Sequence, residues 1–138
     1  MTRQQKFPDT KTFHYHNANP KNRITGDCVF RAISTALEIP YNQVIMEMAE
    51  MSCKTGYAIN DTKGIEKYLK SKGWIKHSQP RKPDNTKYTG AEFCERARTY
   101  ENYIANIGGH HTVAIVGGKV WDIWDSTGGC IGNYWTKG

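Results

Sequence analysis

The spacing of apolar residues changes once along this chain of 138 residues, and the change limits the folds that the chain can adopt. Up to Thr99 the apolar residues recur at helical spacing, as Val29, Ile33 and Leu37 do. From Tyr103 onward they alternate with other residues or form short runs, which is typical of strands. Helices followed by hairpin strands predict an α+β domain, in which N-terminal helices pack on a C-terminal antiparallel sheet.

Four helices and five strands are expected, bounded by capping residues, glycines and prolines. Thr89 and Glu92 form a capping box before one helix, and Gly26-Asp27 supplies a turn and a cap before another. Gly117-Gly118 forms a two-residue hairpin turn that requires positive φ. The expected helices are residues 27–37, 40–53, 62–73 and 89–99, and the expected strands are residues 74–77, 103–107, 111–116, 119–125 and 133–135.

Length, cysteine spacing and the short apolar runs exclude several classes of protein. The chain fits one domain, residues 27–138, preceded by an extended N-terminal arm of residues 1–26. No apolar run approaches the roughly 20 residues of a membrane span, and the N-terminus lacks the apolar stretch of a signal peptide. The four cysteines form no CxxC pair. We therefore expect reduced thiols, a cytoplasmic location and no membrane partner.

Cys28 has the most informative position of the four cysteines. It follows Gly26-Asp27 at the start of an apolar-faced helix, where the positive end of the helix dipole favours a thiolate. The glycine leaves space for a substrate backbone to approach. The alternative is that Cys28 is a small buried apolar residue, the usual role of a free cysteine.

The expected hairpin carries the groups that a cysteine nucleophile needs. An imidazole must take and return the thiol proton, and a third group must orient that imidazole. His111 opens the first strand, and the second strand carries Asp122 and Asp125. With Gly117-Gly118 as the turn, Asp122 lies diagonal to His111 on one face, whereas Asp125 points to the other face unless the strand end turns it inward. Asp122 is slightly favoured and Asp125 is kept as the alternative.

Residues 26–33 resemble the nucleophile helix of papain-like cysteine hydrolases, particularly the small bacteriocin-leader-peptidase-like branch, in which an Asp-Cys pair starts the central helix. The strand that begins at His111 and the segment 122–126 are similar to that family's histidine strand and returning strand. The chain also resembles short phage and prophage proteins of unassigned function over residues 17–136. The motifs shared with those proteins lie at residues 19–21, 26–32, 79–82, 111, 122–125 and 134–135.

The papain-like resemblance implies a minimal α+β papain-like fold and thiol-dependent hydrolysis of a peptide, isopeptide or related acyl bond. Cys28 attacks the carbonyl, His111 moves the proton, and Asp122 or Asp125 holds the imidazole. No cofactor and no metal are implied, and the substrate is a protein or peptide. The phage resemblance implies action in the host cytoplasm, on a host or viral protein.

The chain departs from the papain-like pattern at the oxyanion donor. That family usually places a Gln shortly before the cysteine, and here the position is occupied by Asn22. Asn19 is a second candidate, and backbone N–H groups at the helix start can contribute.

Three tryptophans and three further cysteines have two interpretations each. The tryptophans either line a substrate groove or close the core behind the sheet. The cysteines are expected to be buried, with Cys130, in a glycine-rich loop, as the alternative reactive thiol. These residues are Trp121, Trp124, Trp135, Cys53, Cys94 and Cys130.

A net charge of +6 leaves a competing function open. Under this competing hypothesis, the chain is a non-catalytic binding module on the same scaffold. It sequesters a host protein or nucleic acid through a basic flank. Nucleic acid is the less favoured partner, because a solvated helix and loop explain the same charges. The basic flank comprises Lys67, Lys70, Lys72, Lys76, Arg81, Lys82 and Lys87.

Overall fold

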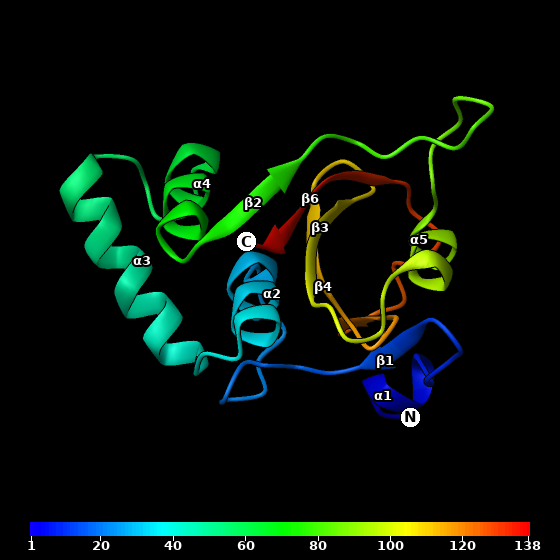
Figure 1. Cartoon of the computed structure of the whole chain (residues 1–138). Helices are drawn as coiled ribbons and strands as arrows, with labels where there is room; N and C mark the ends of the chain where they lie inside the picture. Colours follow the sequence, from blue (N-terminus) through cyan, green and yellow to red (C-terminus); the bar gives the residue numbers. More distant parts are fainter.

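A computed structural model describes all 138 residues and shows an α+β fold of five helices and six strands (Figure 1). Most helices are N-terminal, and most strands are C-terminal. The helices are α1 (Arg3–Lys6), α2 (Cys28–Leu37), α3 (Tyr41–Thr55), α4 (Thr62–Ser71) and α5 (Gly90–Arg96). The strands are β1 (Phe13–Tyr15), β2 (Trp74–His77), β3 (Tyr103–Ile107), β4 (His111–Val116), β5 (Lys119–Asp122) and β6 (Ile131–Lys137).

The six strands form one curled sheet in the order β1-β5-β4-β3-β6-β2. All neighbouring strands are antiparallel except β1, which pairs in parallel with β5. The expected antiparallel sheet is therefore a mixed sheet. The difference arises in the N-terminal segment, which was expected to be an extended arm but contains α1 and the edge strand β1. Phe13 of β1 is completely buried, so this segment contributes to the core.

The hairpin of β4 and β5 has the predicted register. Val116 faces Lys119 and Ala114 faces Trp121, with Gly117 and Gly118 between the strands at φ angles of 60° and 74°. These positive φ values suit glycine and match the right-handed twist of the two strands. The hairpin therefore brings the end of β5 close to the start of β4.

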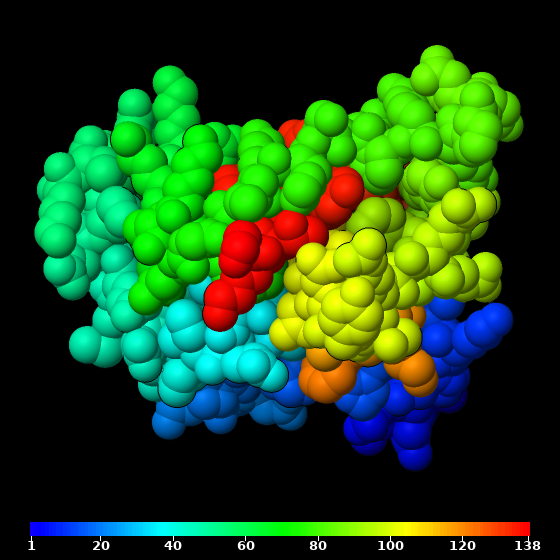
Figure 2. All heavy atoms as spheres, viewed as in Figure 1, coloured from blue at the N-terminus to red at the C-terminus, as the bar shows by residue number.

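The two faces of the sheet are covered differently. Helices α2, α3 and α4 lie on one side, and α5 lies on the other, within the curl of the sheet (Figure 1). Each face has its own hydrophobic core, and successive side chains of β3 alternate between the two. Ile104 belongs to the core beneath α2 and α4, whereas Ala105 and Ile107 belong to the core beneath α5. In the space-filling view, β6 (red) lies in the surface beside β2 (green), its partner at the sheet edge (Figure 2).

Observed boundaries depart from the expected ones mainly at element ends. Helix α5 ends at Arg96, before Thr99, and β5 ends at Asp122, before Asp125. The strand ends where the Asp122 carboxylate turns back and accepts the N–H of Ile123 at 2.8 Å. None of the helices is both long enough and apolar enough to cross a bilayer.

Candidate active site

Three elements bring Cys28, His111 and Asp122 together. Cys28 is the first residue of α2, His111 is the first residue of β4, and Asp122 is the last residue of β5. Helix α2 packs directly against β4, so its N-terminus lies beside the start of that strand. The hairpin register then places Asp122 on the other side of the imidazole.

His111 and Asp122 form a short hydrogen bond. Nε2 of His111 lies 2.5 Å from Oδ2 of Asp122. The Asp122 side chain is 1% exposed and also accepts hydrogen bonds from Ser126 Oγ at 3.2 Å, from the Ile123 N–H and from Arg31. These donors fix the carboxylate, and the carboxylate leaves Nδ1 of His111 free to face another partner.

The shifted pKa values of Cys28 and His111 indicate that the second partner of the imidazole is the Cys28 thiol. Its hydrogen-bonding interaction with His111 lowers the pKa of Cys28 below the ordinary 9.0 and outweighs the opposing effect of burial. The N–H of Thr112 and the positive charge of Arg31 act in the same direction. Burial alone lowers the pKa of His111, but the hydrogen bonds to Asp122 and Cys28 prevail and raise it to about 9. The two shifts together favour a thiolate beside an imidazolium.

Arg31 links this site to the residue before the nucleophile. Its Nη1 lies 2.9 Å from Oδ1 of Asp122, and its Nε lies 2.8 Å from Oδ1 of Asp27. The side chains of these residues are all less than a tenth exposed. Burial raises the pKa of Asp122, but the hydrogen bond from His111 and the one from Arg31 outweigh it, so the pKa falls below its ordinary value. Alternating charges therefore run from Asp27 through Arg31 and Asp122 to His111.

Sequence reasoning assigned Asp27 only a capping role and assigned no role to Arg31. Their spacing of four residues on one helix is the signal that was available, because side chains at i and i+4 meet on a helix face. What the sequence did not reveal is that this face points at the end of β5. The pairing of Arg31 with Asp122, 91 positions away, depends on the tertiary fold.

Asp27 was expected to cap helix α2, and the structure corrects this. Its side chain makes no capping hydrogen bond. Its carboxylate instead accepts hydrogen bonds from Arg31, from Tyr41 Oη at 2.8 Å and from Asn19 Nδ2 at 3.1 Å. The first hydrogen bond at the helix start is donated by the N–H of Arg31 to the carbonyl of Asp27. The N–H groups of the first helical residues, Cys28 among them, are therefore free to bind an oxyanion.

The two asparagines proposed as oxyanion donors differ in their surroundings. The Asn19 amide is engaged on both sides, because Nδ2 donates to Asp27 and Oδ1 accepts the N–H of Lys21 at 2.9 Å. Asn22 is exposed, has a φ of 54°, and uses only its Oδ1, which accepts from Asn17 at 3.4 Å. Of the two, Asn22 keeps an amide N–H₂ that is available to a substrate.

Asp125, the alternative to Asp122, does not contact His111. Its Oδ1 accepts hydrogen bonds from the N–H of Thr127 at 3.0 Å and from its hydroxyl at 2.6 Å, which closes a local turn. The strand has already ended at this point, so Asp125 lies in the loop between β5 and β6. The structure therefore brings only one of the two carboxylates to the imidazole.

The three tryptophans occupy different environments. Trp124 is 38% exposed, and its ring lies 5.1 Å from the His111 ring, so it covers part of the imidazole. Trp135 is buried in the core beneath α2 and α4. Trp121 lies on the outer strand pair and contacts the rings of His14 and His16 at 4.5 Å and 5.0 Å.

The other cysteines are unlike Cys28. Cys94 is buried, and burial raises the pKa of its thiol to about 12. Cys53 and Cys130 are exposed, contrary to the expectation that they are buried. No cluster of three or more His, Cys, Asp and Glu side chains is arranged to hold a metal ion.

Comparison of the chain with protein-family models, with curated proteins and with solved structures finds no match. The function is therefore inferred from the geometry and chemistry of the site.

Proposed function

We propose that this chain is a thiol-dependent hydrolase of peptide, isopeptide or related acyl bonds, built on a minimal papain-like scaffold. The triad is Cys28, His111 and Asp122. The observation that carries the proposal is the position of His111, which hydrogen-bonds Asp122 at 2.5 Å and also interacts with the Cys28 thiol, whose pKa it lowers. A nucleophile, a base and an orienting carboxylate in this order suit nucleophilic acyl transfer.

The reaction follows from the charges of the pair. The Cys28 thiolate forms a bond to the substrate carbonyl carbon, and the carbonyl π electrons move onto oxygen. As the oxyanion collapses, the bond to the leaving group breaks and His111 donates its proton to that group. His111 then takes a proton from water, the resulting hydroxide attacks the thioester, and the thiolate leaves. Water and the acyl compound are thus converted to an acid and the free leaving group.

The oxyanion needs donors close to the sulfur. The backbone N–H of Cys28 is available because Asp27 does not cap the helix, and the dipole of the ten-residue helix adds positive potential there. The N–H₂ group of Asn22 is the side-chain candidate.

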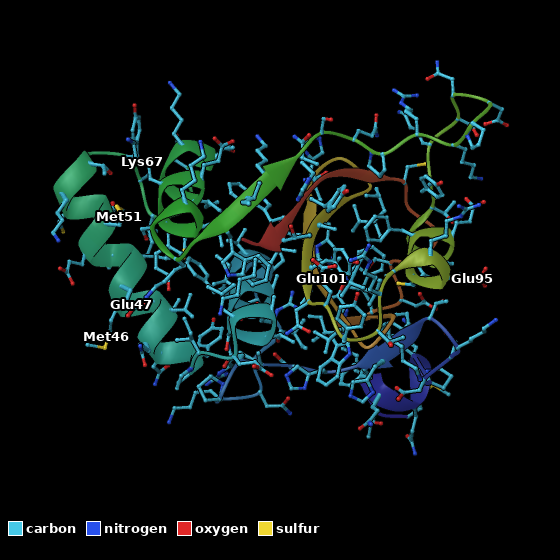
Figure 3. The ribbon with its side chains drawn as sticks, viewed as in Figure 1. Met46, Glu47, Met51, Lys67, Glu95 and Glu101 are labelled. Carbon is cyan, nitrogen blue, oxygen red and sulfur yellow. The ribbon has the colours of Figure 1, made fainter.

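Charge pairing across the basic flank argues against the competing binding module. Lys72 pairs with Glu47 at 3.0 Å, Lys76 pairs with Glu66 at 2.7 Å, and Lys82 pairs with Glu92. Figure 3 shows Glu47 on α3 and Lys67 on the neighbouring α4. Three of the seven basic residues are therefore offset by a carboxylate, which weakens the flank as a surface for phosphates.

Acyl transfer to Cys28 tests the proposal. The purified chain is mixed with excess p-nitrophenyl acetate, p-nitrophenolate release is followed, and the acetylated residue is located by peptide mass mapping. We expect a burst of p-nitrophenolate with acetyl on Cys28, followed by steady turnover, and loss of both in Cys28→Ala. Acetylation of Cys28 no faster than that of the exposed Cys53 and Cys130 would overturn the proposal.

A further inference from the structure

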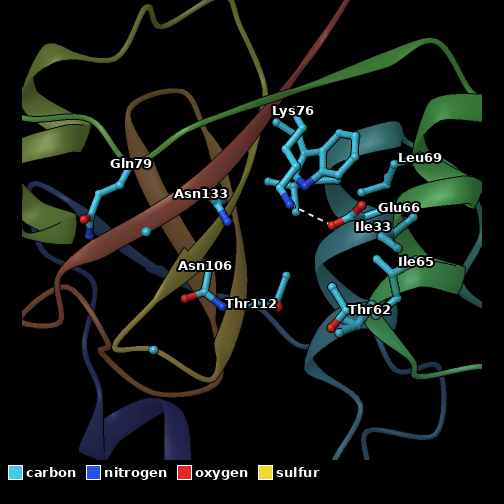
Figure 4. A pocket seen from close by; sticks show the side chains of 15 residues that line it. Ile33, Thr62, Ile65, Glu66, Leu69, Lys76, Gln79, Asn106, Thr112 and Asn133 are labelled. Carbon is cyan, nitrogen blue, oxygen red and sulfur yellow. Dashed lines mark hydrogen bonds and ion pairs between the residues drawn. The ribbon is translucent and has the colours of Figure 1, made fainter.

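A cavity of about 410 Å³ lies between helices α2 and α4 and the sheet (Figure 4). This volume falls within the range of roughly 300–1,000 Å³ that is typical of ligand sites. The helices contribute Val29, Ile33, Thr62, Ile65, Glu66 and Leu69 to its lining. The sheet side includes Lys76, Asn106, Thr112 and Asn133.

The cavity adjoins the candidate active site. Val29 follows Cys28 on α2, and Thr112 follows His111 on β4, and both line the cavity. Cys28 and His111 are not part of the lining themselves, but their direct chain neighbours are, so the reacting sulfur lies next to this cavity.

The two walls have different chemistry. The helix wall is mostly aliphatic: Val29 and Ile65 are partly exposed, whereas Ile33 and Leu69 are almost completely buried (Figure 4). The sheet wall carries the amides of Asn106 and Asn133, and neither of them is buried. An extended peptide suits both walls, because its backbone pairs with amides while its side chain packs on aliphatic carbon.

The only charged side chains in the lining neutralise each other. Lys76 Nζ lies 2.7 Å from Glu66 Oε1, and this ion pair closes one side of the cavity (Figure 4). A charged ligand side chain has no free counter-ion in the cavity and loses hydration on entry. The cavity therefore selects against both acidic and basic side chains.

Strand geometry indicates which side of the scissile bond the cavity serves. Successive side chains of β4 point to opposite faces, so Thr112 faces the cavity whereas His111 faces away from it, toward Trp124. His111 must protonate the leaving group, which therefore lies on the Trp124 side. The acyl part of the substrate then extends into the cavity.

We propose that this cavity binds a neutral aliphatic side chain on the acyl side of the scissile bond, within an extended peptide segment. The inference rests on the proposed hydrolase function and specifies its substrate class.

Peptidyl chloromethyl ketones test the inference, since the Cys28 thiolate displaces chloride and forms a carbon–sulfur bond with the probe. The probes are N-acetyl-Xaa-Gly and N-acetyl-Gly-Xaa chloromethyl ketones with Leu, Glu or Lys as Xaa. Labelling of Cys28 is measured by mass spectrometry, with iodoacetamide as a small reference reagent. We expect the Leu probe to react at least about tenfold faster than the Glu and Lys probes at one of the two positions.

Variants of α4 link this preference to the cavity. Ile65→Trp and Thr62→Trp fill the cavity from the helix wall, and the second changes an exposed residue that tolerates substitution. Both should abolish the preference for Leu and leave the iodoacetamide rate unchanged. The control Lys67→Trp lies on the exposed face of the same helix and should keep the preference (Figure 3).

Two failures are distinguishable. If iodoacetamide itself shows no selective reaction with Cys28, the hydrolase proposal fails, and the substrate class falls with it. If Cys28 reacts selectively but the three peptidyl probes react within about twofold of one another at both positions, or the preference survives in Thr62→Trp, the cavity assignment alone is overturned.

Discussion

The buried carboxylate of Asp122 pairs with two positively charged side chains, those of His111 and Arg31. Its Oδ2 holds His111, and its Oδ1 holds Arg31. Arg31 keeps the carboxylate ionised in spite of burial, and it also draws part of the negative charge away from His111. The imidazole is thereby held in one orientation.

Asp122→Asn should lower the rate of acyl transfer by about 10³-fold, because an amide orients the ring without stabilising the imidazolium. The pKa of His111, about 9 in the native chain, should fall in this variant. Asp125→Asn is the matched control, since Asp125 only closes a local turn. Its rate should stay within about twofold of wild type. Equal losses in the two variants would contradict the assignment of the third triad member.

Arg31→Met should lower the free energy of unfolding at pH 7 by about 3–5 kcal/mol, because the buried carboxylates of Asp27 and Asp122 lose the cation that they share. In the native chain the pKa values of Asp27 and Asp122 lie below the ordinary 3.8, so this stabilisation is present above pH 3.8 and is lost as the pH falls through the lowered values. The deficit of the variant should therefore shrink in acid. Urea unfolding of both proteins from pH 7 to pH 2 measures it, and a deficit that stays the same below pH 3.8 would refute the electrostatic role.

At the scale of elements, helix α5 depends on a glycine for its approach to the sheet. A Cβ on Gly90 would lie 2.6 Å from Ile107 Cδ1 and 3.1 Å from the backbone Cα of Thr127. The helix begins with the predicted capping box of Thr89 and Glu92, and its first turn packs directly on the loop that follows Asp125.

Gly90→Ala should lower the free energy of unfolding by about 1–3 kcal/mol, because the methyl group would displace the end of the Ile107 side chain and press on the Thr127 backbone. Gly128→Ala serves as the control, since no atom lies within 4 Å of its added Cβ. Thermal unfolding followed by circular dichroism compares the two. A destabilisation by Gly128→Ala as large as that by Gly90→Ala would show that the effect is not steric.

Local signals predicted elements better than contacts between distant elements. The capping box of α5 and the Gly117-Gly118 turn are encoded by adjacent residues and were predicted correctly. The turn also fixes the register, which is why the position of Asp122 relative to His111 was predictable. Strand β1 was missed because three residues carry too little periodicity and its parallel partner β5 lies about a hundred residues further along the chain. The role of Arg31 was missed as well, because its partner Asp122 lies 91 positions further along the chain.

At the scale of the whole molecule, the N-terminal segment adds the edge strand of the sheet beside the active site. Strand β1 pairs with β5, and the N–H of His16 donates to the carbonyl of Asp122 at 2.9 Å. Phe13 is completely buried. The segment therefore supports the strand that carries Asp122.

Phe13→Ala should lower the free energy of unfolding by about 3–5 kcal/mol, the usual loss for a buried aromatic residue. Phe7→Ala, at a partly exposed position of the same segment, should cost much less. Chemical denaturation measures both. If Phe13→Ala is as mild as Phe7→Ala, the segment is an arm on the surface and not a part of the core.

The pH dependence of Cys28 alkylation tests the thiolate–imidazolium pair most directly. Between the lowered pKa of Cys28 and the pKa of His111 near 9, the sulfur is ionised and the imidazole is protonated. Iodoacetamide should therefore label Cys28 below pH 7 much faster than the exposed Cys53 and Cys130, and His111→Ala should abolish this difference. Labelling of Cys28 at the rate of Cys53 and Cys130, or selective labelling that persists in His111→Ala, would contradict the account.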